Sequence, residues 1–197
     1  MTVAVQKLTF EEYLKYEDGT DTRYELVNGE LVPVSVGRGI DGLIIDFLVD
    51  RIKLAIAEMG RDDLALAGLV GVRSPRGRRL DTSRIPDITV LPREQMEEMI
   101  DREAVIDLDE PAPSLAIEVV SPSTKREDYR AKQWEYCFLG ILEYWIVDPT
   151  EQKITIGVLN DEAGEYELYE FEESERLKSS VLPTLKLTAS QVLSRRS

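Results

Sequence analysis

Two acidic residues stand out because of the apolar segments in which they lie. Asp87 lies in the run Ile-Pro-Asp-Ile-Thr-Val that begins at Ile85, and Glu118 lies inside the apolar run Ser114–Ser121. An ionised carboxylate in a buried strand is costly unless it is paired or bound to a metal ion. If both strands belong to one sheet, the two carboxylates can share a site. Together with a backbone carbonyl they suit Mg²⁺ or Mn²⁺, which prefer oxygen ligands.

The segment after Glu118 offers a lysine that can complete such a site. Ser121 and the residues that follow it turn the chain directly into a predicted helix, Thr124–Leu139. Five polar residues recur on this helix at intervals of three and four and therefore share one face: Lys125, Asp128, Tyr129, Lys132 and Tyr136. Lys132 has a long stem that reaches back toward Glu118, and Lys125 is the competing candidate. The alternative is an ordinary exposed helix face, with Glu118 held in a purely structural ion pair.

The surrounding segments predict a mixed β-sheet flanked by helices, which is an α/β (α+β) fold. Hydrophobic periodicity and turn signals predict these strands and hairpins: the hairpin Arg23–Val34 with its turn at Asn28-Gly29, Leu64–Val72, Ile85–Leu91, Ser114–Ser121, Glu143–Asp148, and a closing hairpin of Lys153–Leu159 and Tyr166–Phe171. Capping signals and a period of 3.6 predict these helices: a short helix opened by Thr9, Ile40–Met59, Arg93–Asp101, Thr124–Leu139 and Ala189–Leu193. No internal repeat or linker interrupts residues 1–197, so we expect a single domain.

Composition narrows the chemistry that these residues can perform. The 197 residues, 43% of them hydrophobic, suffice for one domain with a sizeable core. There is no histidine, which excludes a histidine base, a histidine-ligated zinc site and a serine–histidine or cysteine–histidine nucleophile pair. Cys137 is the only cysteine, and no apolar run reaches the ~20 residues of a membrane span. We therefore expect a cytoplasmic protein with no membrane partner.

The charge of the chain is unevenly distributed. The net charge is −14, which by itself argues against a nucleic-acid partner, because phosphate contacts need lysine and arginine. However, the stretch Arg73–Arg84 carries five arginines against one aspartate, while acids concentrate around Arg93–Glu110 and Asp161–Glu175. This asymmetry is compatible with a basic cleft on an acidic body. A solvated arginine-rich loop is the alternative interpretation.

The motifs described above occur in an order that resembles the PD-(D/E)XK nuclease superfamily. Within it, the chain closely resembles a large family of restriction-endonuclease-like proteins of unknown function. The resemblance extends from Leu8 to Leu193 and rests on a specific set of segments: RYELVNGELV at 23–32, RIPDITVL at 84–91, LAIEVVSPST at 115–124, the series Asp128, Lys132 and Tyr136, and EYWIVDP at 143–149.

The resemblance implies roles for the acids and the lysine. Asp87 and Glu118 correspond to the metal-binding acids of the motif, and the carbonyl of Val119 adds a third oxygen ligand for Mg²⁺ or Mn²⁺. The third motif position, normally a lysine, is Val120 in this chain. The resemblance places the lysine on the following helix instead, which points to Lys132.

The resemblance also implies a role for Glu25. It matches an additional active-site acid that such nucleases take from a preceding element, although a hairpin residue paired with Arg23 or a lysine is the alternative. Related proteins often have a histidine near the start of the helix expected over Ile40–Met59. This chain has none, which puts a role for that position in doubt and leaves the acids and the lysine unaffected.

The function implied by the resemblance is hydrolysis of DNA phosphodiester bonds by a metal-dependent endonuclease, acting as a homodimer. Candidate DNA contacts lie in the arginine-rich stretch and on the lysine-bearing helix: Arg73, Arg76, Arg78, Arg79, Lys125 and Tyr129. Two rival functions remain open. One is a catalytically inert protein that uses the fold for binding or assembly. The other is a hydrolase that acts on a small phosphorylated molecule.

Overall fold

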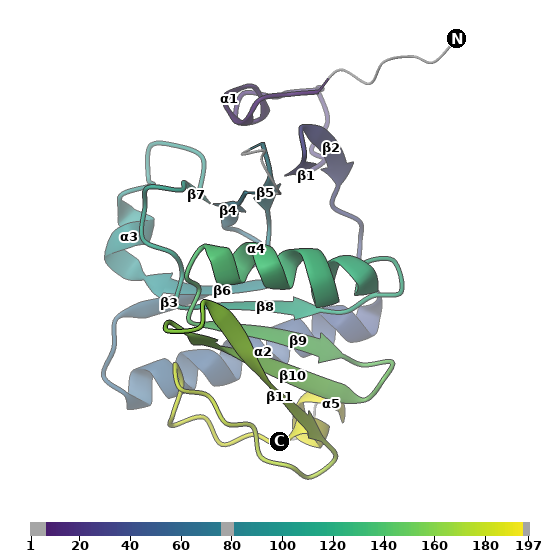
Figure 1. Ribbon diagram of the computed structural model, residues 1–197, viewed down its shortest axis with the longest axis vertical. Coiled ribbons are helices and arrows are strands. Elements are labelled where there is room, and N and C mark those ends of the chain that lie inside the picture. Colours follow the sequence, from purple (N-terminus) through teal and green to yellow (C-terminus); the bar gives the residue numbers. More distant parts are fainter. Residues whose placement is uncertain (1–6, 76–80, 195–197) are drawn as a thin grey trace.

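Two β-sheets form the framework of the chain in the computed structural model, which describes residues 7–75 and 81–194 (Figure 1). The larger sheet has six strands in the order β11 (Glu165–Glu172), β10 (Lys153–Asn160), β9 (Glu143–Asp148), β8 (Leu115–Val119), β6 (Ile88–Pro92) and β3 (Asp63–Ala67). The smaller sheet has five strands in the order β2 (Glu30–Pro33), β1 (Tyr24–Val27), β5 (Ser83–Arg84), β4 (Gly71–Arg73) and β7 (Val105–Ile106). Each sheet contains one parallel pair, β8 with β9 and β4 with β7.

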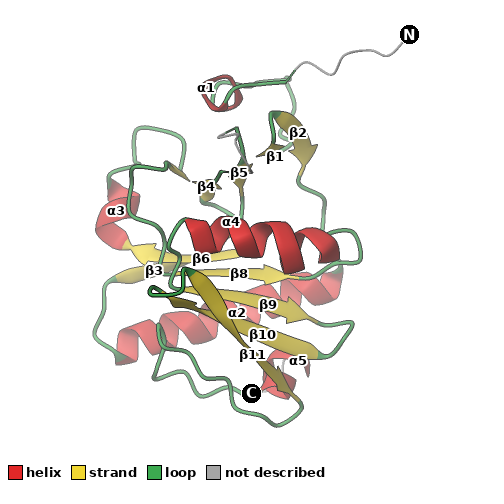
Figure 2. Cartoon of the chain, viewed as in Figure 1, coloured by secondary structure: helices red, strands yellow, loops and turns green. Residues whose placement is uncertain are grey.

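Helices cover both faces of the larger sheet (Figures 1 and 2). On one face, α2 (Gly39–Glu58) packs with its buried Leu48 and Ile52 against strand residues such as Ile117. The remaining helices are α1 (Phe10–Tyr13), α3 (Arg93–Glu97), η1 (Glu127–Lys132), α4 (Gln133–Phe138) and α5 (Ala189–Ser194). Helices η1 and α4 form one continuous helical segment on the opposite face, where Tyr136 packs against Ala116. Because neighbouring residues of a strand point to opposite faces, β8 contributes to both cores.

The pairing of the central strands places the two conspicuous acids together. Strand β6 runs antiparallel to β8 with Ile88 opposite Ile117. Asp87 immediately precedes β6 and therefore lies beside the last residues of β8. The N–H of Val119 donates a hydrogen bond of 2.7 Å to Oδ2 of Asp87. The mixed α+β fold expected from the sequence is thus confirmed, and it brings Asp87 next to the strand that carries Glu118.

Several local signals in the sequence are also confirmed. Asn28 and Gly29 both have positive φ angles, 52° and 82°, which is the geometry of the tight turn that their types predict. Thr9 caps α1, and Glu12 bonds back to the Thr9 N–H in a capping box. No helix within residues 7–75 and 81–194 is long and apolar enough to cross a membrane.

Four expectations about the elements and their arrangement differ from the structure. The single strand expected over Leu64–Val72 is two strands in different sheets, because Gly68, with a φ of 54°, breaks the run and β4 pairs with β5 and β7. For the same reason there are two sheets rather than one. The helix expected over Arg93–Asp101 ends at Glu97, and the regular helix expected over Thr124–Leu139 contains a π-helical segment, η1.

A buried carboxylate fixes the segment that precedes α5. Glu143, at the start of β9, has no exposed surface. Its carboxylate accepts hydrogen bonds from Trp145 Nε1 at 2.9 Å, Ser179 Oγ at 2.7 Å, Ser180 Oγ at 2.6 Å and the Val181 N–H at 3.0 Å, and also from the Ser180 N–H. This one side chain therefore satisfies donors from two distant parts of the chain.

We predict that Glu143→Ala lowers the free energy of unfolding by more than about 3 kcal/mol, because several buried donors lose their acceptor at once. Urea denaturation followed by tryptophan fluorescence measures the change. Glu165→Ala, at an exposed position of β11, is the matched control and should change stability by less than about 0.5 kcal/mol. Equal stability of the two variants would contradict the role given to Glu143.

Candidate active site

The two acids predicted from the sequence lie side by side at one end of β6 and β8. Asp87 is partly buried, and Glu118 is 3% exposed. Both oxygens of Glu118 have partners, since Tyr136 donates its hydroxyl to Oε1 at 2.8 Å and Lys132 Nζ lies 2.9 Å from Oε2. For Asp87 the Val119 N–H occupies Oδ2. The carboxylates thus share one site, as their sequence contexts predict.

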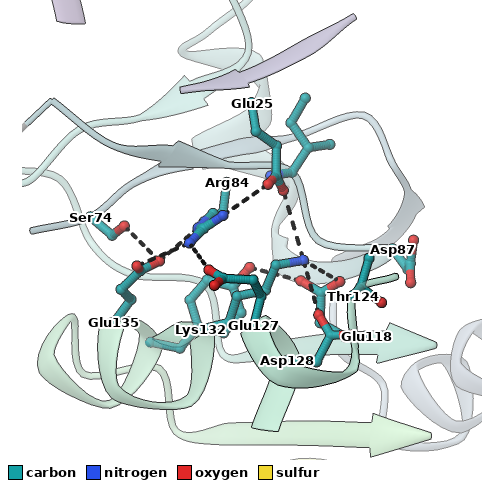
Figure 3. A network of polar contacts seen from close by, with 12 residues as sticks. Glu25, Ser74, Arg84, Asp87, Glu118, Thr124, Glu127, Asp128, Lys132 and Glu135 are labelled. Atoms are coloured by element: carbon teal, nitrogen blue, oxygen red, sulfur yellow. Dashed lines mark hydrogen bonds and ion pairs between the residues drawn. The ribbon is translucent and has the colours of Figure 1, made fainter. Parts of the chain in front are cut away.

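Lys132 is the lysine that the structure brings to these acids (Figure 3). Its ammonium lies 2.9 Å from Glu118, 3.3 Å from Oδ1 of Asp128 and 3.8 Å from Oε1 of Glu25. The side chain is buried, and it closes η1 at its last residue. Short π-helical segments occur frequently at functional sites. We define the acid cluster as Glu25, Asp87, Glu118 and Asp128 together with Lys132.

The competing lysine lies elsewhere. Lys125 Nζ is 2.6 Å from Glu151 and 3.3 Å from Asp148. Tyr129, another residue of the predicted helix face, points its hydroxyl to Asp148 Oδ2 at 3.4 Å. The helix face predicted from the sequence is therefore divided: Asp128, Lys132 and Tyr136 belong to the site, whereas Lys125 and Tyr129 contact Asp148.

Burial and the opposite charges nearby shift the pKa values of the acid cluster in opposite directions. Burial raises the pKa of Asp87 to about 6, and burial also raises the pKa of Glu118 well above its usual value. Burial alone would raise the pKa of Glu25, but Lys132 and Arg84 outweigh it and hold that pKa below its usual range. Burial opposes the charge of Lys132, yet Glu118, Glu25 and Asp128 outweigh it and raise its pKa, so the ammonium stays protonated.

A buried arginine, Arg84, is linked to the acid cluster through Glu25. Arg84 is 2% exposed, and its guanidinium contacts Glu135 at 2.7 Å, Glu25 at 3.0 Å and Glu127 at 3.1 Å (Figure 3). The Ile85 N–H adds a bond of 3.1 Å to Oε1 of Glu25. Glu25 therefore joins Arg84 to Lys132. Of the two partners considered from the sequence, a lysine and Arg23, only a lysine contacts Glu25.

Two of the five arginines in the stretch Arg73–Arg84 are held by contacts with other parts of the protein. Arg84 is buried, and Arg73 lies 3.0 Å from Asp107, with its guanidinium 4.1 Å from the centre of the Phe10 ring. Both side chains thus form internal contacts instead of facing a phosphate backbone. Three further candidates lie outside the described residues: Arg76, Arg78 and Arg79.

A cleft of about 760 Å³ opens beside the acid cluster. Its lining includes Glu25, Asp87, Glu118, Val119 and Lys132, together with parts of residues 32–45 and 121–124. One lining residue was missed by sequence reasoning. Arg38 is fixed by Asp41 at 2.8 Å and by the carbonyl of Val120 at 3.1 Å, and no local sequence motif indicates that the start of α2 lies at this cleft.

The side chains of the acid cluster fit a magnesium-like ion in chemistry. Within residues 7–75 and 81–194, no three acid, histidine or cysteine side chains are arranged as a ready-made metal cage. Mg²⁺, however, is commonly held by one or two carboxylates and several waters. Asp87 Oδ1 makes no hydrogen bond to the described residues. The acids of the cluster offer only oxygen atoms as metal ligands. Four carboxylates face one ammonium, so an added cation offsets charge that burial makes unfavourable.

We predict that Asp87→Asn stabilises the metal-free protein at pH 8. The pKa of Asp87 is raised on folding, so its ionisation opposes folding above about pH 6, and this penalty fades as the pH falls toward the unfolded value. The substitution should add up to about 3 kcal/mol at pH 8 and almost nothing at pH 4. The amide oxygen still accepts the Val119 N–H. Thermal unfolding in EDTA at the two pH values tests this, and a variant less stable than the wild type at pH 8 would refute it.

Comparison with known proteins places this arrangement in a family. A model of the Uma2 family, described as "Putative restriction endonuclease", matches residues 10–190. Among solved structures, the chain is similar to a protein from Anabaena variabilis described as a "putative nuclease" of DUF820, with 20% identity, a TM-score of 0.74, and coverage of 95% of this chain and 98% of that one. That likeness shows a shared fold, and among curated proteins none matches the chain. Since the family match includes the whole acid cluster, this chain belongs to the Uma2 family of restriction-endonuclease-like proteins.

Proposed function

We propose that this chain is a divalent-metal-dependent endonuclease that hydrolyses phosphodiester bonds of DNA. One observation carries the proposal: Asp87, Glu118 and Lys132 meet at one cleft, with the lysine ammonium 2.9 Å from the glutamate. Two carboxylates beside a charged lysine are suited to bind a metal ion and to neutralise a phosphate. Membership of a family described as "Putative restriction endonuclease" supports the same function.

Four residues of the acid cluster have distinct roles in this proposal: Glu25, Asp87, Glu118 and Lys132. Asp87, Glu118 and the carbonyl oxygen of Val119 would hold Mg²⁺ or Mn²⁺. When bound, the ion would supply Lewis-acid stabilisation of the phosphate and would lower the pKa of water. Tyr136 holds Glu118 in place through its hydroxyl. Because Val119 and Asp87 are linked by a hydrogen bond, the ligands on the two strands are positioned together.

Lys132 acts through its charge rather than as a base. Its raised pKa keeps the ammonium protonated at neutral pH, so it has no lone pair with which to accept a proton. It neutralises the negative charge that develops on the phosphate and orients the attacking water. Glu25 contacts Lys132 from the smaller sheet and is itself fixed by Arg84, which limits the movement of the ammonium.

The cleft offers two cations to the DNA backbone. Among the described residues that line it, Lys132 and Arg38 are the only lysines or arginines. Arg38 is oriented by Asp41 and keeps a side chain that is 40% exposed, so we propose it as a phosphate contact. On the basis of the sequence, three arginines of the stretch Arg73–Arg84 remain proposed phosphate contacts: Arg76, Arg78 and Arg79.

Cleavage of both strands of a duplex uses two active sites. A twofold-symmetric dimer is the commonest oligomer and supplies two such sites. We therefore propose a homodimer as the active form. A reducing, cytoplasmic setting accords with the lone Cys137.

We predict that purified protein cleaves plasmid DNA with Mg²⁺ or Mn²⁺ and that EDTA abolishes cleavage. Asp87→Asn removes a metal ligand, and Lys132→Met removes the charge that stabilises the transition state. Each should reduce the cleavage rate by about 100-fold or more, the scale for losing one electrostatic contact to a transition state. Lys53→Met, at an exposed position of α2 outside the lining of the cleft, is the matched control and should cleave within a few-fold of the wild type. Gel electrophoresis gives the rates, and circular dichroism verifies folding.

A metal titration separates this function from the two rivals. Calorimetry should detect Mn²⁺ binding that Glu118→Gln abolishes. If the wild type binds no metal and cuts no DNA, the chain is an inert form of the fold. If it hydrolyses nucleotides and leaves DNA intact, it is a small-molecule phosphoester hydrolase.

A further inference from the structure

A stripe of four exposed side chains runs along the helical segment that carries Lys132. The stripe consists of Arg126, Arg130, Trp134 and Phe138, which follow one another at intervals of four residues. All four are exposed, whereas Asp128 and Lys132 on the inner side of the same segment are buried in the acid cluster. One helical segment therefore has two different faces, and the proposed mechanism uses only the inner one.

The two aromatic residues of the stripe have no place in the core. Trp134 is 49% exposed and Phe138 is 65% exposed. Their rings stack on each other with centres 5.5 Å apart and an angle of 28° between the planes. Exposing two large aromatic side chains next to each other leaves apolar surface in water, so the arrangement indicates a ligand with a flat apolar face.

The two arginines of the stripe are also without partners. The guanidinium groups of Arg126 and Arg130 form no hydrogen bond or ion pair with any residue in the described ranges 7–75 and 81–194. Both line a hollow of about 300 Å³ that Trp134 shares. Glu127 and Glu135 lie in the same lining, but both contact the buried Arg84, which balances part of their charge.

Charge decides which ligand fits. The chain carries a net charge of −14 and repels a polyanion over most of its surface, so unpaired arginines mark where an anionic strand can approach. The bases of a duplex are stacked on one another, whereas unpaired bases are free to stack on aromatic side chains.

The stripe also begins at the rim of the catalytic cleft. Thr124 lines the cleft, and Arg126 follows it by two residues. Figure 1 shows the helical segment lying across the larger sheet, below the smaller sheet. A nucleic-acid strand that leaves the cleft over this helix meets the two arginines first and the two aromatic rings next.

We propose that this stripe binds an unpaired nucleic-acid strand, with Arg126 and Arg130 on phosphates and the Trp134–Phe138 pair against bases. The proposal deepens the proposed nuclease function and rests on it for the path of the strand. It adds that the substrate has a single-stranded region next to the cleavage point. Binding itself requires neither metal nor cleavage.

The two tryptophans of the chain make the test direct. Trp145 has no exposed surface, so a ligand in solution reaches only Trp134. The wild-type protein in EDTA is titrated with three ligands of equal length. They are a short oligodeoxythymidylate, its RNA counterpart and a DNA duplex. We expect the single strands to quench the emission of Trp134 and the duplex to quench it less. Trp134→Phe should abolish the fluorescence change.

Variants separate stacking from charge. Trp134→Ala should weaken binding of the single strand by about 5- to 150-fold, measured by fluorescence anisotropy of a labelled strand. Arg126→Gln combined with Arg130→Gln should reduce the slope of log affinity against log salt by about 1.4, since each phosphate contact on a single strand contributes about 0.7. Arg51→Gln, on α2 across the sheet, is the matched control and should change neither quantity.

Two results would overturn the proposal. One is an oligonucleotide affinity that is the same in the wild type, Trp134→Ala and the arginine double variant. The other is shielding of Trp134 from acrylamide that grows with protein concentration alone and disappears in Phe138→Ala, because the stripe is then an interface between two copies. Plasmid cleavage is measured separately. Cleavage without strand binding refutes only the stripe, and strand binding without cleavage refutes only the nuclease function.

Discussion

The contact between the Lys132 ammonium and the Glu118 carboxylate is the interaction on which the arrangement of this chain depends. It lies between a central strand and a helix, and both side chains are nearly inaccessible to water. Either charge alone would be very unfavourable there, and breaking such a pair leaves the other charge uncompensated. The pair therefore ties the position of the helix to the position of the strand. Asp128 and Tyr136, on the same helix, add one contact to each partner.

This pair does not balance the site completely. Carboxylates outnumber cations around the cleft, and burial raises the pKa of both Asp87 and Glu118. A fold selected for stability alone would replace some of these acids. Their presence is the kind of local conflict expected at functional sites, where a binding partner supplies the missing charge. The core clusters on both faces of the larger sheet provide the stability that tolerates it.

The sequence predicted the inner site better than its surroundings. Asp87 and Glu118 were recognisable because a charge within an apolar strand is locally conspicuous. The helix period left Lys125 and Lys132 as candidates, and the family resemblance pointed to Lys132. The role of Arg84 was not recognisable, since its partners Glu25, Glu127 and Glu135 are more than 40 residues away in the chain. A cluster of arginines has the same composition whether it faces solvent or a buried glutamate. The splitting of Leu64–Val72 likewise depends on which partner strand is nearby, and local pattern does not encode that.

The smaller sheet is attached to the larger one in two different ways. Near β7, the apolar residues Ile106, Leu91 and Met99 pack together in one cluster. Beside the cleft, the attachment runs through the helical segment that covers the larger sheet and includes ion pairs. Glu25 pairs with Lys132, and Arg84 pairs with Glu127 and Glu135. Apolar packing resists sliding and separation, whereas ion pairs rearrange when a new charge enters. In mechanical terms the joint resembles a hinge, fixed at its apolar end and adjustable at the end beside the cleft.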